Sequence, residues 1–291
     1  MTAPKGAVLL EAARPRTLVA GAVPVVVGTA AAGAVDPWRF AAALVVSLSL
    51  QVAVNFANDL FDARRGVDTP ERLGPRRTVS SGLLSERAAG AVVAACFAVA
   101  ALAGGALAIA VGPELLAVGA ACFLAALGYS GGPRPYGSAA LGELLVFVFF
   151  GLVATAGSAY VQTERLEAVA VAAALPVGLL AAAILLVNNV RDLPTDRRAG
   201  KRTLAVVLGA PAARRAFGAL VLASFPGVAL VALAAHSAWP LLALAALPAA
   251  RPPLALAGAD DPAKLVGALV GTARLEAVLG LLLAAGLWLA R

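Results

Sequence analysis

Apolar runs close to 20 residues long recur along the whole chain, and they constrain its fold more than any other feature. A run of this length crosses the hydrocarbon core of a bilayer as an α-helix. The runs are rich in Ala, Leu, Val and Gly and do not alternate polar with apolar residues, which favours helices over a β-barrel. We predict nine membrane spans, at residues 17–35, 39–60, 88–111, 114–130, 139–161, 168–190, 214–235, 238–257 and 267–289.

The composition supports the same conclusion. Of the 291 residues, 61% are hydrophobic and only 13% are charged, and the mean hydropathy is +0.90. This leaves too little polar surface to cover a water-soluble protein of this size. Because no linker or low-complexity spacer divides the chain, we predict an all-α integral membrane protein with a single domain over residues 1–291.

The basic residues decide the predicted orientation. The formal net charge is +7, and Arg and Lys concentrate in the two longest polar connections, residues 61–87 and 191–213, whereas the connections after the third and seventh spans carry neither. The positive-inside rule therefore places both basic connections and the N-terminus in the cytoplasm, in a multi-pass protein of the cell's inner (plasma) membrane. A nucleic-acid partner is excluded, since that would need a basic stripe on a soluble face.

Two acidic clusters open these basic connections. The first contains Asn55, Asn58, Asp59 and Asp62, whose spacings of three and four residues place them around one face of a helix. In the second, Asn188, Asp192 and Asp196 follow at intervals of four. Pro194 predicts that this second helix loosens before Asp196.

Carboxylates gathered at membrane level cost on the order of a few kcal/mol per buried charge unless a cation is bound there. Mg²⁺ prefers oxygen ligands and is often shared between carboxylates and substrate phosphates, so we expect Mg²⁺ here. Five basic residues beside the clusters are expected to contact a diphosphate: Arg64, Arg65, Arg191, Lys201 and Arg202. The alternative is that these charged residues form an ordinary solvated loop at the membrane surface. That explanation is adequate for one such loop, but less so for two loops that both repeat Asn and Asp followed by basic residues.

These motifs resemble those of the UbiA superfamily of intramembrane prenyltransferases, which carry N-x-x-x-D-x-x-x-D at the cytoplasmic ends of the second and sixth of nine helices. The stretch NNVRDLPTD (188–196) matches at all three positions. The stretch NDLFDARRGVD (58–68) matches at Asn58 and Asp62, but has Gly66 at the third position and Asp68 two residues later. The resemblance therefore leaves open whether Asp59 or Asp68 completes the metal site, with Asn55 as a further candidate.

Several stretches look like one branch of that superfamily, the 1,4-dihydroxy-2-naphthoate polyprenyltransferases of menaquinone synthesis: RPRTLVAGAVPVVVGTA (14–30), the first acidic motif, residues 129–162 and residues 188–209. The resemblance implies a nine-helix bundle with a cytoplasmic cap over a central polar cavity. It also implies transfer of a polyprenyl group from polyprenyl diphosphate to 1,4-dihydroxy-2-naphthoate, with loss of CO₂ and diphosphate, giving demethylmenaquinol. The implied metal ligands are Asn58, Asp59, Asp62, Asn188, Asp192 and Asp196, of which Asp62, Asp192 and Asp196 are catalytic.

The implied acceptor carries a carboxylate and two hydroxyls, so residues near the membrane surface with matching side chains are candidates for binding it. They are Arg14, Tyr129, Arg134, Tyr136 and Glu143. The two tyrosines are alternatively interfacial anchors, and Glu143 is alternatively a structural hydrogen-bond partner.

Two rival functions stay open at this point. One is a prenyltransferase of the same fold with another acceptor, 4-hydroxybenzoate or haem. The other is a divalent-cation or phosphate transporter, since carboxylates inside a membrane often mark ion pathways. A transporter predicts acidic residues near the bilayer midplane and on both sides, whereas here the clusters end two spans on one face.

Overall fold

The structure is a computed structural model that describes residues 5–66 and 77–291. Within these residues the chain is helical. In chain order the elements are α1 (Lys5–Ala13), η1 (Pro15–Thr17), α2 (Val19–Ala32), α3 (Pro37–Arg64), α4 (Glu86–Ala110), α5 (Glu114–Gly128), η2 (Tyr136–Ser138), α6 (Gly142–Val146), η3 (Phe147–Ala156), α7 (Gly157–Thr163), α8 (Ala168–Arg198), α9 (Leu204–Leu208), α10 (Ala210–Ala234), η4 (Trp239–Ala250), α11 (Arg251–Ala257) and α12 (Pro262–Leu289).

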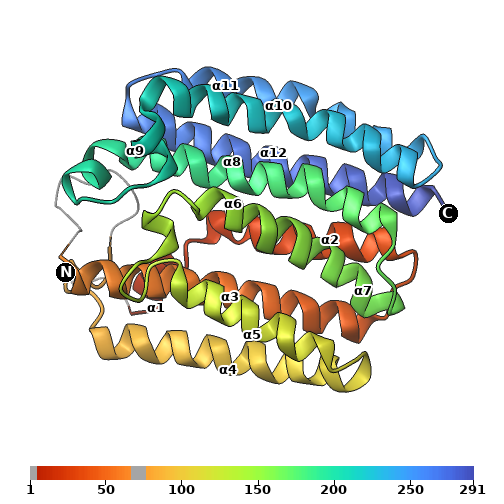
Figure 1. The fold of residues 1–291 in the computed structure, drawn as a ribbon, viewed down its shortest axis with the longest axis horizontal. Helices are drawn as coiled ribbons and strands as arrows, with labels where there is room; N and C mark the ends of the chain where they lie inside the picture. The colour runs from red at the N-terminus through yellow and green to blue at the C-terminus, as the bar shows by residue number, and fades with distance from the viewer. Residues whose placement is uncertain (1–4, 67–76) are drawn as a thin grey trace.

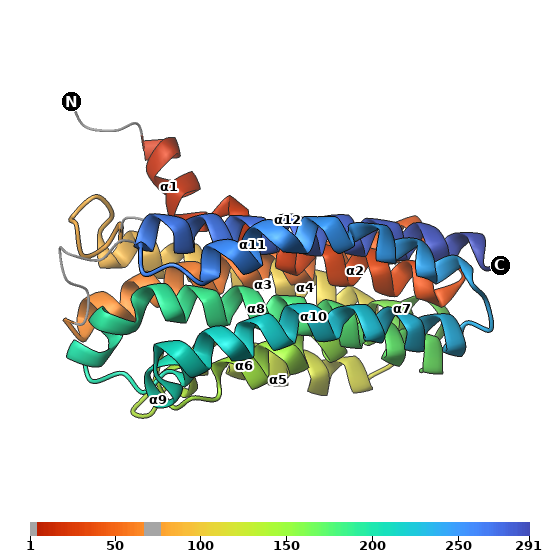
Figure 2. The same cartoon turned by 90° about the horizontal axis from the view of Figure 1, so that it is seen from above.

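The long helices lie side by side along one common direction, as both views of the ribbon show (Figure 1, Figure 2). The carboxyl ends of α3 and α8 lie at the same end of this bundle. The short helices α1 and α9 lie at that end too, whereas the C-terminus of the chain lies at the opposite end (Figure 1). The topology therefore brings the two acidic clusters to one end of the molecule.

Seven helical segments are long and apolar enough to cross a membrane, and α2 and α5 are shorter apolar helices. This identifies a multi-pass membrane protein. The predicted count of nine spans is not confirmed, because the 14 residues of α2 and the 15 of α5 extend only about 21–23 Å at 1.5 Å per residue. A bilayer core is about 30 Å thick.

The sequence marks the starts of two long helices with the pair Asp-Pro. Asp36 accepts a hydrogen bond from the backbone N–H of Trp38 at 3.1 Å, and Pro37 is the first residue of α3. Asp261 does the same for Ala263 at 2.9 Å, with Pro262 first in α12. The aspartate cap accepts from one of the free N–H groups of the helix start, and the proline in the first turn has no N–H that would need a partner.

Both helices that carry the acidic clusters run further than their predicted spans. The prediction ends these spans at residues 60 and 190, but α3 continues to Arg64 and α8 to Arg198. The expectation that the second helix loosens at Pro194 is therefore wrong. A proline removes one backbone hydrogen bond, and the Thr195 hydroxyl adds another by donating to the Asp192 carbonyl at 2.7 Å. Asp196 therefore stays on the helix.

Close packing between helices depends on small residues. The largest buried cluster joins α2, α8, α10, η4 and α12. Where α8 crosses η3, Gly178 meets Gly151, and a Cβ added at Gly151 would lie 2.7 Å from the Gly178 Cα. Only glycine allows two backbones to approach this closely, as is common where helices pack in membranes.

A second buried cluster joins the cap to the bundle. It contains Ala12 of α1, Phe56 and Leu60 of α3, Val79 and two residues of α4. Because Val79 belongs to this cluster, the described part of the connection between α3 and α4 folds back onto the bundle, as predicted. The fold thus positions a polar cap at the end where α3 and α8 finish.

Candidate active site

The two acidic clusters face each other across one cavity of about 590 Å³. Asn58 and Asp62 line it from α3, and Asn188, Asp192 and Asp196 line it from α8. A direct contact also joins the two sides, since the Lys201 Nζ, just after α8, lies 3.0 Å from the Asp62 Oδ2. Lys201 and Asp62 are 139 residues apart in sequence, so the fold joins two distant segments into one site.

Asp62 is a heavily paired carboxylate of the cavity lining. Besides Lys201, it accepts hydrogen bonds from Arg65 at 2.9 Å and from Arg77 at 3.0 Å. Its side chain is 4% exposed. Three cationic side chains around one buried carboxylate create a locally positive wall, and Arg65, Arg77 and Lys201 themselves line the cavity. Such a wall suits a polyanionic ligand.

Asp59 has a different environment, although it neighbours Asn58 in sequence. It is 1% exposed and is not among the residues that line the cavity. Its Oδ1 accepts from Arg14 at 2.8 Å and from Arg77 at 2.7 Å, and its Oδ2 accepts from the backbone N–H and the hydroxyl of Thr78 at 2.9 and 3.0 Å. The geometry makes Asp59 the anchor of the cap rather than a residue that faces a ligand.

In the second cluster, an arginine organises the acidic residues. Arg191 donates to both carboxylate oxygens of Asp192, at 2.7 and 2.8 Å, and to the Asn188 Oδ1 at 2.9 Å. Arg191 is buried and is not among the cavity-lining residues. It holds Asp192 and Asn188 from behind, in the two-pronged geometry that suits a guanidinium and a carboxylate.

The structure does not bring every predicted residue to the cavity. Arg64 pairs with Glu86 at 2.8 Å, where both side chains are half exposed. Arg134 and Arg202 are exposed, and neither lines the cavity. Asp68 lies outside the described residues. Among the predicted diphosphate ligands, Arg65 and Lys201 are therefore the two that face the cavity.

Of the predicted acceptor-binding residues, three line the cavity: Arg14, Tyr129 and Tyr136. The two tyrosine rings meet edge to face with centroids 5.5 Å apart. The Tyr136 hydroxyl donates to the Ala125 carbonyl at 2.8 Å, and burial raises the pKa of Tyr136 to about 12. Tyr136 is therefore a neutral donor at physiological pH that braces the connection between α5 and α6.

Glu143 lies behind the lining and not in it. It is 5% exposed, and its Oε1 accepts a hydrogen bond from the Asn189 Nδ2 at 2.9 Å. Asn189 does line the cavity. Glu143 therefore orients Asn189, which matches the structural alternative considered for it.

Sequence reasoning missed three residues of the site. Arg77 bridges Asp59 and Asp62, Thr78 closes the shell of Asp59, and Asn189 faces the cavity. No spacing rule signals Arg77 or Thr78, because they belong to a loop that folds back. Asn189 follows Asn188 directly, and the doubled asparagine on a membrane helix is a signal that was available.

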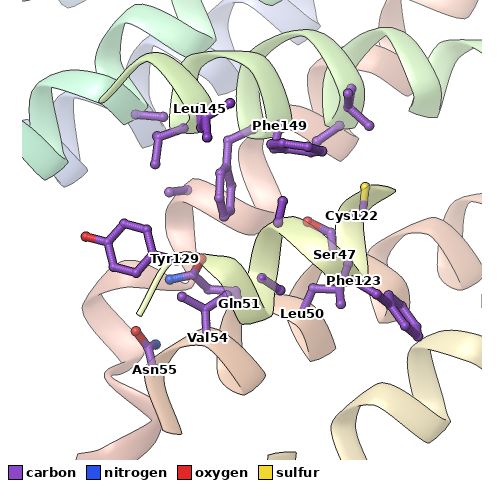
Figure 3. Close-up of a pocket in the computed structure, with 18 of the residues that line it drawn as sticks. Ser47, Leu50, Gln51, Val54, Asn55, Cys122, Phe123, Tyr129, Leu145 and Phe149 are labelled. Atoms are coloured by element: carbon purple, nitrogen blue, oxygen red, sulfur yellow. The ribbon is translucent and has the colours of Figure 1, made fainter. Parts of the chain in front are cut away.

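The rest of the cavity is apolar and follows the helices away from the acidic end. Figure 3 shows Leu50 and Val54 of α3, Phe123 of α5 and Leu145 and Phe149 on the opposite side around the same space. The lining continues to Leu107 and Leu115, at the end of α4 and the start of α5. One cavity thus combines a charged end with a long apolar arm.

The oxygen donors of the lining fit a hard divalent cation, since carboxylates and amide oxygens are the ligands that Mg²⁺ prefers. They do not form a ready-made cage. Within residues 5–66 and 77–291, no group of three or more His, Cys, Asp or Glu side chains lies close enough together to hold a metal ion by itself. This arrangement fits an ion that is shared between the protein and a bound phosphate group.

The chain matches the UbiA prenyltransferase family over residues 21–264. It is 43% identical over 244 residues to a 1,4-dihydroxy-2-naphthoate octaprenyltransferase of Mycobacterium tuberculosis, covering 83% of this chain and 82% of that protein. It is 30% identical over 289 residues to the protein of the same name from Bacillus subtilis, covering 97% and 92%.

Solved structures of low sequence identity share the fold. A UbiA homolog from Aeropyrum pernix superposes with a TM-score of 0.67 at 20% identity, covering 93% of this chain and 96% of that one. A UbiA homolog from Archaeoglobus fulgidus, bound to DMAPP and Mg²⁺, superposes with a TM-score of 0.61 at 16% identity, covering 94% and 98%. Together with the facing acidic clusters, these matches establish that the chain belongs to the UbiA prenyltransferase family.

Proposed function

We propose that this protein transfers a polyprenyl group from polyprenyl diphosphate to 1,4-dihydroxy-2-naphthoate, giving demethylmenaquinol, CO₂ and diphosphate. The observation that carries the proposal is the single cavity with a charged end and an apolar arm. The relatives that bear the name 1,4-dihydroxy-2-naphthoate octaprenyltransferase support this choice of acceptor. We further propose that residues 1–291 act as one domain.

The diphosphate of the donor is assigned to the charged end. Arg65 and Lys201 line the cavity and are both paired with Asp62. When a diphosphate enters, these cations gain a second set of oxygen partners. The carboxylates of Asp62, Asp192 and Asp196, together with Asn58 and Asn188, are then available to hold Mg²⁺ against the same diphosphate. Held by these residues, Mg²⁺ would supply positive charge against the leaving group.

The reaction breaks one bond and forms another at the allylic carbon. The C–O bond to the diphosphate breaks, and the diphosphate leaves with the electron pair while Arg65 and Lys201 stabilise its charge. The ring carbon that bears the carboxylate attacks the allylic cation and forms the new C–C bond. The bond to the carboxylate then breaks, CO₂ leaves, and its electron pair restores the aromatic ring. No external oxidant or base is consumed.

The apolar arm is assigned to the polyprenyl tail. It runs from the acidic end of α3 toward Leu107 and Leu115 at the far ends of α4 and α5. Placing a hydrocarbon there removes apolar surface from water, at roughly 25 cal/mol per Å². Exclusion of water around the reacting carbon also protects the allylic cation from hydrolysis.

We propose that the site opens to the cytoplasm of the cell, in the plasma membrane, with the N-terminus on the same side. The support is the charge distribution along the sequence, since Arg and Lys concentrate in residues 61–87 and 191–213, the connections that follow the carboxyl-terminal parts of α3 and α8. Basic connections on one side predict the cytoplasmic side.

A direct assay tests the function and its rivals together. The purified protein is given one prenyl diphosphate and Mg²⁺, with 1,4-dihydroxy-2-naphthoate, 4-hydroxybenzoate or a haem as acceptor, and products are identified by mass. The proposal predicts a decarboxylated, prenylated naphthalene product and far slower turnover of the other two. Turnover of 4-hydroxybenzoate or haem alone contradicts the acceptor assignment. Tracer flux of a divalent cation or phosphate into proteoliposomes without any product contradicts the enzyme assignment.

A further inference from the structure

Three polar side chains of α3 line the cavity below the acidic end, at intervals of four residues: Ser47, Gln51 and Asn55. This spacing places them on one face of the helix. Neither Gln51 nor Asn55 has a position in the chemistry described so far. Both are more than nine-tenths buried, at 8% and 3% exposed. Buried amides beside a hydrocarbon slot require an explanation.

The hydrogen bonds fix which way the two amides point. The Asn55 Nδ2 donates to the Ala13 carbonyl at 2.9 Å and to the Thr17 Oγ1 at 3.1 Å. Because a backbone carbonyl can only accept, the amide nitrogen of Asn55 must face α1. The Gln51 Nε2 donates to the same Thr17 Oγ1 at 3.1 Å. The Thr17 hydroxyl gives its own hydrogen to the Arg14 carbonyl at 3.0 Å, so it accepts from both amides.

The carbonyl ends of Gln51 and Asn55 are therefore left to the cavity. Within residues 5–66 and 77–291, neither oxygen accepts a hydrogen bond from the protein. Neither oxygen is among the fully buried side-chain atoms that lack a hydrogen-bond partner. Since neither is hydrogen-bonded and neither is fully buried, both oxygens are accessible from the cavity. Figure 3 shows Gln51 and Asn55 on the α3 side of the pocket together with Tyr129.

Residues four apart on a helix hold their Cβ atoms about 5–6 Å apart. Two oxygens placed para to each other on one aromatic ring are separated by a similar distance. Two amides that start from Cβ atoms at this spacing, with both nitrogens held by Thr17, can offer their oxygens to two para hydroxyl donors of one ring, whereas a hydrocarbon tail gains nothing from them. Arg14, whose backbone carbonyl holds Thr17, also lines the cavity and supplies a cation beside them.

We propose that the carbonyl oxygens of Gln51 and Asn55 accept the two hydroxyl hydrogens of the aromatic acceptor and so select a para-dihydroxy ring. This rests on the proposed function and adds the residues that choose its acceptor. The amide pair holds the ring about two to three turns of α3 from Asp62, in the same cavity as the proposed diphosphate site. Thr17, which also lines the cavity, acts as a positioning residue, since its hydroxyl oxygen accepts a hydrogen bond from each amide nitrogen.

The test compares wild-type protein and Gln51→Met, with 1,4-dihydroxy-2-naphthoate and with 1-hydroxy-2-naphthoate, which lacks the second hydroxyl. In wild type, loss of that hydroxyl is expected to raise the acceptor KM at least 10-fold. In Gln51→Met, the KM for the dihydroxy acceptor is expected to rise about 10-fold or more, while the KM for the prenyl donor stays within about 2-fold. The preference for the dihydroxy acceptor should shrink by the same factor.

Ser47→Ala is the matched control. Its hydroxyl donates to the Gly21 carbonyl at 2.7 Å, so the variant also removes one tie between α3 and the N-terminal helices, but it removes no amide oxygen. Its acceptor preference should equal that of wild type. Equal preference in Gln51→Met and wild type, or a parallel rise in both KM values, overturns the proposal.

The wild-type measurement keeps the proposal testable if Gln51→Met does not fold, because equal use of both acceptors by wild type also overturns it. Absence of any dihydroxynaphthoate turnover in wild type is a separate outcome that contradicts the proposed function itself. The two failures are therefore distinguishable within one set of assays.

Discussion

Asp59 and Asp62 lie three residues apart on α3, yet the structure assigns them different tasks, and substituting each with alanine separates these tasks. Asp59 accepts four hydrogen bonds, two from arginines and two from Thr78. In Asp59→Ala the Arg77 guanidinium, which is 8% exposed, loses the Asp59 carboxylate, and the backbone N–H and hydroxyl of Thr78 lose their acceptor. Removing one partner of a buried ion pair costs about 3–5 kcal/mol.

Asp62→Ala is the matched comparison. Its partners Arg65 and Lys201 are more accessible, at 32% and 15% side-chain exposure, so water can replace the lost carboxylate, and Arg77 keeps Asp59. We therefore expect Asp59→Ala to lower the apparent melting temperature of the detergent-solubilised protein by several degrees. Asp62→Ala should lower it much less while reducing transfer more than 100-fold.

Thermal unfolding followed by intrinsic fluorescence, measured beside turnover at a fixed heating rate, checks both expectations. The reasoning is refuted if Asp59→Ala melts like wild type but has lost all activity. That outcome would return Asp59 to the group of metal ligands that the resemblance implies.

Three further expectations follow from the site. Asp192→Ala should reduce transfer more than 100-fold and still be extracted as folded protein, and substantial residual turnover in both it and Asp62→Ala would contradict the assigned metal role. Excess chelator should abolish prenyl transfer and added Mg²⁺ should restore it. Full activity in metal-free buffer would contradict the proposed requirement for Mg²⁺. Lys201→Met should raise the donor KM about 10-fold with little effect on the acceptor KM, whereas Arg134→Met, at an exposed position outside the cavity, should change neither. A donor KM unchanged by Lys201→Met would exclude its contact with the diphosphate.

Periodicity and residue chemistry predicted the helical membrane fold and the meeting of the two acidic clusters. Long apolar runs form helices because a single segment in lipid can pair all its backbone N–H and C=O groups only as a helix. The Asn and Asp residues at intervals of three and four share a helix face regardless of the details of packing. Asn58, Asp62, Asn188, Asp192 and Asp196 accordingly line the cavity.

The features of the site that could not be predicted from the sequence depend on contacts between distant segments. Spacing on α3 does not distinguish Asp59, which turns toward Arg14 and Thr78, from Asp62, which turns toward Lys201. Arg77 reaches both carboxylates from a folded-back loop, and loop paths are not written in a periodic pattern. Arg134 was a candidate for binding the acceptor because of its charge and its place in a connection near the membrane surface. In the structure its side chain is exposed to solvent.

The central claim is that the ends of α3 and α8 hold one diphosphate between them. An experimental structure of the protein with Mg²⁺ and an unreactive thio-analogue of the prenyl diphosphate tests it most directly. The account predicts the diphosphate in the cavity, with Asp62 on one side and Asp192 on the other sharing metal ions with it, and Lys201 against its oxygens. A diphosphate bound away from both helix ends, or held by one of them alone, would contradict it.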